Sequence, residues 1–143
     1  MIRNTAVTVC GPLNVNKLGV TYVHEHLMVK PQLPDEYYIP YTLDDEAAST
    51  EETRSFSAAG GETLVEMTPI NYGRNVKAYQ RIAQATGVHV ICCTGFHKQL
   101  FMPPWFGDKT DGELYDILMD EVTNGLDDTE IHPGVIKLGT SFE

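Results

Sequence analysis

The chain has 143 residues, of which 42% are hydrophobic, and this predicts one globular domain with a packed core. Its net charge is −10, and its acidic residues lie mostly at 35–62 and 108–130. A nucleic-acid partner is excluded because phosphate binding needs clustered Lys and Arg. We also expect no membrane association, since no apolar stretch approaches the roughly 20 residues of a membrane span.

The first core strand is predicted at 18–23, a run that reads as buried and ends at His24-Glu25-His26. Residues two apart in a strand point to the same face, so His24 and His26 present two imidazoles side by side. Such a pair suits a divalent metal, and packed or solvent-facing histidines are the alternative. A shorter strand at 7–9 is predicted to be antiparallel and to act as a cap.

The remaining elements alternate between helix and strand. A proline-rich loop is predicted at 28–43, helices at 44–59, 75–86 and from Thr110 to about Gly125, and strands at 63–67, 88–94 and 135–138. Thr110 and Glu113 fit a capping box, and the helix that they open carries an apolar stripe that is predicted to pack in the core, made of Leu114, Ile117, Leu118 and Val122.

This alternation predicts right-handed βαβ units and a parallel sheet, either doubly wound or closed as a (β/α)₈ barrel. Residues with ligand-type side chains fall at strand ends, namely His24, His26, Glu66 and Lys137. Chemistry gathered at the carboxyl ends of successive strands favours the barrel. A nucleotide-binding doubly wound sheet is disfavoured because no Gly-rich phosphate loop follows any strand.

The three cysteines are Cys10, Cys92 and Cys93, an odd number with two neighbours in one strand. This is a poor disulfide framework, so we expect free thiols and a reducing, cytoplasmic compartment. A vicinal redox pair, or metal binding by Cys92, is the alternative.

Lys137 lies between Ile136 and Leu138 in a strand that is predicted to be interior. A lone buried ammonium is costly, so this side chain must be paired, neutral or modified. One interpretation is a lysine that reaches solvent or pairs with Glu66. The other is a neutral amine that adds carbon dioxide, giving a carbamate whose two oxygens bridge two divalent ions.

Several segments together resemble the phosphotriesterase family of the amidohydrolase superfamily. The first is Gly19-Val-Thr-Tyr-Val-His-Glu-His-Leu27, which is similar to that family's first-strand signature. Further segments follow in the family's order at 60–68, 73–75, 86–91, 93–97 and 134–141. The resemblance covers nearly the whole chain.

The resemblance implies a (β/α)₈ barrel, of which residues 1–143 supply about the first four strands, with no separate second domain. It implies two divalent metal ions, commonly zinc, with His24 and His26 on the more buried one. Lys137 would be the catalytic lysine, carrying carbon dioxide as a carbamate that bridges both ions. A hydroxide shared by the metals would attack a lactone or carboxylic ester, or a phosphotriester as the less favoured substrate.

Two histidines and an aspartate that complete the family's site have no counterpart here. His89 and His132 are interpreted as a packed strand residue and a loop residue. His97 is a candidate for the substrate pocket together with Trp105, and the further aromatic candidates for the pocket mouth are Tyr37, Tyr38 and Phe106.

A half barrel leaves sheet edges unpaired. We therefore expect the missing C-terminal half to come from the same polypeptide or from a second chain, a homodimer being one arrangement. The partner of the complete enzyme would be a small-molecule ester or lactone, and the isolated chain would be inactive. The alternative function is a non-catalytic half barrel that serves as an assembly or partner-binding module.

Overall fold

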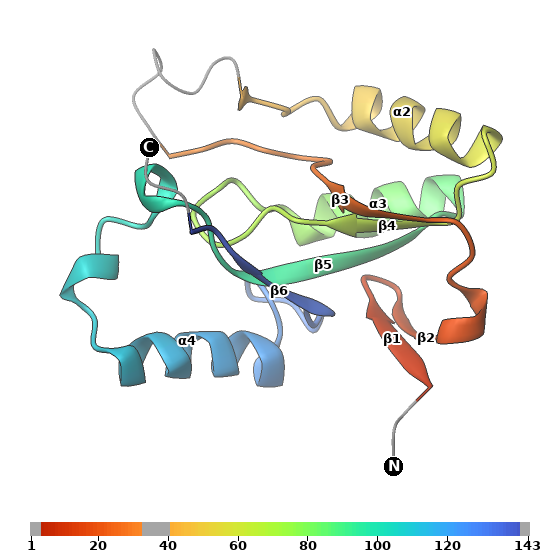
Figure 1. The fold of residues 1–143 in the computed structure, drawn as a ribbon. Coiled ribbons are helices and arrows are strands. Elements are labelled where there is room, and N and C mark those ends of the chain that lie inside the picture. The colour runs from red at the N-terminus through yellow and green to blue at the C-terminus, as the bar shows by residue number, and fades with distance from the viewer. Residues whose placement is uncertain (1–3, 33–40, 141–143) are drawn as a thin grey trace.

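The computed structural model describes residues 4–32 and 41–140 (Figure 1). Tyr37 and Tyr38 lie outside this part of the chain. In order, its elements are β1 (Thr5–Thr8), β2 (Gly11–Asn14), η1 (Val15–Lys17), β3 (Thr21–Glu25), α2 (Glu46–Ala58), β4 (Thr63–Glu66), α3 (Val76–Thr86), β5 (His89–Phe96), η3 (Gln99–Phe101), η4 (Phe106–Asp108), α4 (Asp111–Asn124) and β6 (Val135–Leu138).

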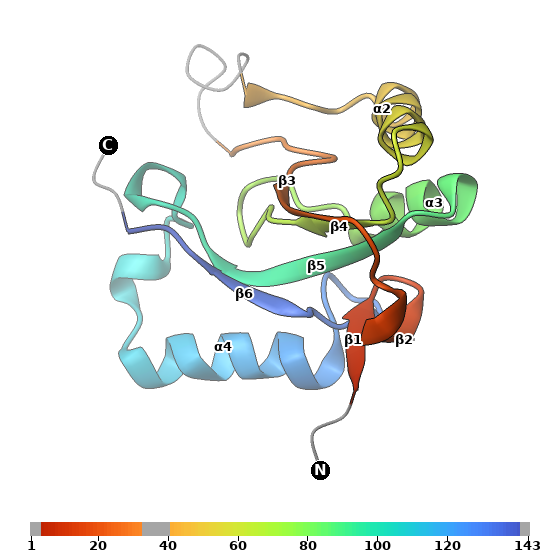
Figure 2. The same cartoon turned by 45° about the vertical axis from the view of Figure 1, so that its right-hand side comes forward.

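Four of these strands form a parallel sheet in the order β3-β4-β5-β6. The sheet is curled, and α2, α3 and α4 lie along its outer side (Figure 2). The predicted alternation of parallel strands and helices is therefore confirmed. This arrangement brings the carboxyl ends of all four strands to one rim.

The core lies between α3 and the outer face of the sheet, where Leu64, Val90 and Cys92 meet Tyr79 and Ile82. The helix begins where the Asn75 side chain accepts a hydrogen bond from the Ala78 amide, and it ends at Gly87 in the left-handed conformation. Its buried residues recur at helical spacing, so this amphipathic stripe holds the sheet's outer face.

The apolar stripe of α4 is less buried than predicted. The capping box of Thr110 and Glu113 is present, but no residue of this helix is buried, and Val122 is 43% exposed. The helix lies under the β5–β6 side of the sheet (Figures 1 and 2), and β6 is the last strand of that sheet. Within residues 4–32 and 41–140, no element covers the far side of α4, so its stripe packs on one flank only.

The two outer strands also differ from expectation. The run that ends at His24 was predicted to be buried, yet Val20 is 62% and Val23 69% exposed. In β6, which was predicted to be interior, Ile136 is 61% and Leu138 68% exposed. Both strands are edges of the described sheet, and each has a hydrogen-bonded neighbour on one side only.

The predicted N-terminal cap is confirmed, because β1 and β2 form an antiparallel hairpin. Just after β1, the buried Val9 donates its amide hydrogen to the Val90 carbonyl at 2.9 Å. Val90 lies near the start of β5, so the hairpin covers the amino-end side of the sheet, away from the rim where the strands end.

All three cysteines are free, with Cys92 and Cys93 buried and Cys10 exposed. Burial raises the pKa of the Cys92 thiol to about 12, so this group stays neutral.

In the part of the chain that the structure describes, no helix has the length and apolar character needed to cross a membrane.

Candidate functional site

The two histidines after the first core strand meet at the rim of the sheet. His24 lies in β3 and His26 follows it, and their Nε2 atoms are 3.3 Å apart. Two nitrogens at about 2.0–2.1 Å from a tetrahedral zinc ion would be about 3.3–3.4 Å apart. The side chains therefore already have the separation that two ligands of one ion require.

Two buried polar side chains hold His26 through its Nδ1 atom, namely Glu66 at the end of β4 and Thr68 just after it. Its Nδ1 lies 2.8 Å from the Thr68 hydroxyl, which donates to Glu66 Oε1 at 2.5 Å. Glu66 also accepts hydrogen bonds from the amides of Leu27 and Thr68, and its side chain is fully buried. Burial raises the pKa of Glu66 to about 7, against the opposing effect of these hydrogen bonds.

His97 follows β5 and lies in an aromatic cluster on the same rim. Its ring is 4.5 Å from the Tyr72 ring and 4.8 Å from the Phe101 ring, and Tyr72 packs edge-on against His26 at 5.8 Å. The Lys98 amide donates to His97 Nδ1 at 2.7 Å. Because Nδ1 accepts, the neutral ring carries its proton on Nε2, which leaves an N–H donor for another molecule.

Lys137 is half-buried in β6, where it pairs in register with Gly95 of β5. Burial, together with the charges of His24 and Lys137, lowers the pKa of His26 to about 4. Burial and the charge of Lys137 likewise lower the pKa of His97 to about 4. The Lys137 ammonium therefore acts on both rings, and among the described residues no ion pair joins it to Glu66, the partner considered above.

The other sequence candidates lie elsewhere. Trp105 packs against Phe96 at 6.1 Å, and Phe106 packs against the same ring at 4.9 Å. His97 directly follows Phe96, the last residue of β5, but no ring contact joins Trp105 to His97. His132 Nδ1 is 3.1 Å from the Val122 carbonyl, and His89 begins β5 at its opposite end.

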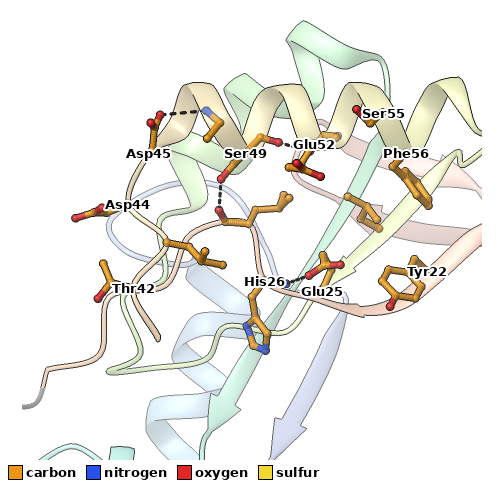
Figure 3. Close-up of a pocket in the computed structure, with 15 residues that line it drawn as sticks. Tyr22, Glu25, His26, Thr42, Asp44, Asp45, Ser49, Glu52, Ser55 and Phe56 are labelled. Carbon is orange, nitrogen blue, oxygen red and sulfur yellow. Dashed lines mark hydrogen bonds between the residues drawn. The ribbon is translucent and has the colours of Figure 1, made fainter. Parts of the chain in front are cut away.

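A cavity of about 580 Å³ lies between β3 and α2, and Tyr22, Glu25 and Phe56 contribute to its lining (Figure 3). His26 borders it, but the His26 ring points away from Ser49 and Phe56 of α2. The cavity therefore belongs to the outer helix layer and is separate from the face on which the imidazoles meet.

Sequence reasoning missed Thr68, Tyr72 and Phe101. The segment from 68 to 74 reads as a turn, and nothing in its spacing indicates contact with His26 or His97. Within residues 4–32 and 41–140, no three side chains of His, Cys, Asp or Glu gather closely enough to hold a metal ion. The histidine pair would need a ligand of another type, for which Lys137 is a candidate because its charge acts on the His26 ring, or ligands from beyond these residues.

Comparisons with known proteins agree with this geometry. The phosphotriesterase family profile matches residues 4–143. A phosphotriesterase-related protein from Nematostella vectensis is 31% identical over 99% of this chain and 50% of its own length. A phospho-furanose lactonase from Mycoplasmopsis synoviae is 32% identical, over 99% of this chain and 45% of its own.

Solved structures give the same result. A lactonase from Listeria monocytogenes superposes with a TM-score of 0.86 and 28% identity, covering 96% of this chain and 48% of that one. An organophosphorus hydrolase from Deinococcus radiodurans superposes with a TM-score of 0.79 and 33% identity, covering 94% and 43%.

The curled parallel sheet with its helices is therefore part of a (β/α)₈ barrel, and the predicted fold class is confirmed. The chain belongs to the phosphotriesterase family, as its sequence motifs indicate. It spans about half the length of the curated relatives that it matches.

Proposed function

We propose that this chain is the N-terminal half of a metal-dependent hydrolase barrel that acts on lactones or carboxylic esters. The observation that carries this proposal is the 3.3 Å separation of the His24 and His26 Nε2 atoms at the rim of the sheet, under the influence of Lys137. The names of the relatives, which include lactonases and organophosphorus hydrolases, support a hydrolase of this family.

In this proposal His24 and His26 would hold a divalent cation, with zinc as the first choice, and Lys137 would supply further ligand atoms for a pair of such ions. For this role the neutral Lys137 amine adds to carbon dioxide and loses a proton, which leaves a carbamate with two ligand oxygens. The half-buried Lys137 side chain is placed for that chemistry, because it lies close enough to His26 and His97 for its charge to act on both rings. A bound metal pair would lower the pKa of water and stabilise negative charge on the attacked carbonyl group.

The aromatic cluster supports substrate binding beside the histidine pair. His97 offers its Nε2–H to an ester or lactone oxygen, and Tyr72 and Phe101 hold its ring in place. Trp105 remains a candidate for the pocket wall if the loop after β5 contributes to it. Lactones and carboxylic esters are favoured over phosphotriesters, in agreement with the relatives that are named lactonases.

The proposal needs further strands to complete the barrel, from the same polypeptide or from a second chain such as another copy of this one. The exposed apolar residues of β3 and β6 support this requirement. The free, buried thiols of Cys92 and Cys93 support a cytoplasmic location.

The test is metal content and hydrolysis by the full polypeptide that carries this chain. We expect about two zinc ions per barrel and turnover of a lactone panel, both lost in His24→Ala while the circular dichroism spectrum is retained. His132→Ala, in a loop away from the rim, is the control and should keep both. A metal-free, inactive but folded wild type would contradict the enzyme and support the assembly-module alternative.

A further inference from the structure

A chain of hydrogen bonds runs from the interior of the molecule to the imidazole of His26. Thr68 Oγ1 lies 2.8 Å from His26 Nδ1 and 2.5 Å from Glu66 Oε1. Thr68 and Glu66 are both fully buried, whereas the His26 side chain is 26% exposed. The two buried groups therefore approach His26 from the side opposite to the nitrogen that faces His24.

The chemistry of the three groups sets the direction of this chain. Each Glu66 oxygen accepts a backbone hydrogen bond, Oε1 from Leu27 and Oε2 from Thr68, so the ionised form of Glu66 acts only as an acceptor. The Thr68 hydroxyl has a single hydrogen, and Glu66 Oε1 accepts it. Thr68 Oγ1 can then only accept from His26, which requires the His26 proton to be on Nδ1.

We propose that Thr68 and Glu66 are positioning residues that hold His26 in its Nδ1–H tautomer and so turn the Nε2 lone pair toward His24. The partner of one imidazole nitrogen decides what the other nitrogen can bind. Partners of this kind typically change metal affinity 10- to 100-fold. The purpose of the arrangement rests on the proposed function, because a lone pair on Nε2 serves a metal ligand.

The identity of Glu66 supports a role beyond packing. Two backbone amides and one hydroxyl could be satisfied by a neutral side chain, whereas a buried carboxylate is costly to desolvate. When Glu66 is ionised, its charge strengthens the acceptor at the end of the chain, and this increases the preference for a proton on Nδ1 of His26.

The first experiment reads the tautomer directly, by nitrogen-15 NMR of the full polypeptide labelled at histidine and stripped of metal by a chelator. We expect Nδ1–H for His26 in the wild type and in Thr68→Ser, and Nε2–H in Thr68→Val. Thr63→Val is the matched control, because Thr63 is equally buried and its hydroxyl bonds the Leu18 carbonyl instead. Nε2–H for His26 in the wild type would overturn the proposal, whether or not the variants fold.

The second experiment measures zinc affinity by competition with a chelating indicator. Thr68→Val should bind zinc about 10- to 100-fold more weakly than the wild type. Thr68→Ser and Thr63→Val should stay within about threefold, given the usual spread of such effects. Unchanged affinity and tautomer in folded Thr68→Val would refute the positioning role. Absence of zinc binding in the wild type would instead refute the proposed function, and the tautomer measurement would still decide this inference.

Discussion

Lys137 is the residue on which the proposed chemistry depends most. It is half-buried in an edge strand between two exposed apolar residues, and its charge acts on His26 and on His97. A lysine that served only solubility would have no reason to lie on the inward side of β6. The carbamate role of Lys137 in the proposed function rests on this position.

Replacing Lys137 with alanine should remove the bridge while leaving the strand intact. In the full polypeptide we expect Lys137→Ala to lose metal and hydrolytic activity by more than the roughly 10- to 100-fold that follows when only a partner of a metal ligand is removed. Short carboxylic acids such as propionate should partly restore activity, because a carboxylate can take the place of the carbamate. Lys77→Ala, an exposed lysine on α3, is the control. Activity in Lys137→Ala equal to the wild type would contradict the assignment.

Arg74 and Arg81 show how burial decides the strength of an ion pair. The Arg74 guanidinium is 4% exposed and bonds Glu121, Asp127 and the Cys93 carbonyl, so it ties the loop before α3 to α4 and β5. Arg81 binds Glu46 through two nitrogens, but it is 56% exposed. The two arginines therefore differ in burial and in the number of partners that they bind.

We predict that Arg74→Met destabilises the protein by about 3–5 kcal/mol, because Glu121 and Asp127 lose their buried partner. Arg81→Met, which removes a pair that water screens, should leave the unfolding midpoint close to that of the wild type. Urea unfolding followed by circular dichroism measures both. Equal midpoints for the two variants would show that the Arg74 contacts do not contribute to stability.

At the scale of single residues, the sequence predicts the positions of side chains that lie in, or directly after, regular strands. Strand alternation places His24 and His26 on one face, and the ends of successive strands bring Lys137 and His97 to the same rim. Thr68, Tyr72 and Phe101 were not predictable, because loops bring them to the histidines and loop geometry leaves no periodic pattern. Glu66 pairs with Thr68 and not with Lys137, and this choice of partner depends on the face of β4 from which the Glu66 side chain projects.

At the scale of elements, Gly95 sets how closely β5 and β6 approach. A Cβ at this position would lie 2.0 Å from the Lys137 carbonyl oxygen, and the backbone has φ of 110°. Both the contact and the dihedral angle require glycine. The close approach of these two strands therefore fixes the register that delivers Lys137 to the rim.

Gly95→Ala should push β6 away and lower both stability and metal binding. Gly60→Ala provides the matched control, because Gly60 has a similar φ of 96° but open space around its Cβ. The difference between the two unfolding midpoints isolates the clash from the backbone strain. A Gly95→Ala variant no less stable than Gly60→Ala would show that β6 moves freely.

Helices and strands were predicted well where local signals were strong, as at the Asn75 and Gly87 boundaries of α3 and at the Thr110 capping box. The burial of the outer elements α4 and β3 was predicted wrongly. The stripe of α4 and the run of β3 carry the apolar residues of interior elements, yet Val122 and Val23 are exposed. Sequence patterns record what an element is suited to pack against, and the described chain supplies only one flank of that packing.

At the scale of the whole molecule, the unpaired edges lead to the last prediction. Hydrogen exchange should distinguish the chain of residues 1–143 alone from the completed barrel that the proposed function requires. In the chain alone, amides on the free sides of β3 and β6 should exchange rapidly, because no strand accepts their hydrogen bonds. In the full polypeptide the same amides should be protected, since closure of a barrel pairs both edges.

The inner strands β4 and β5 provide the reference, because each has a neighbour on both sides and should be protected in both samples. If 143-residue chains close the barrel by pairing with each other, protection of β3 and β6 will rise with protein concentration, together with the mass measured by light scattering. Equal, rapid exchange at both edges in the full polypeptide would contradict barrel closure. The shared site would then lack the strands that its remaining ligands require.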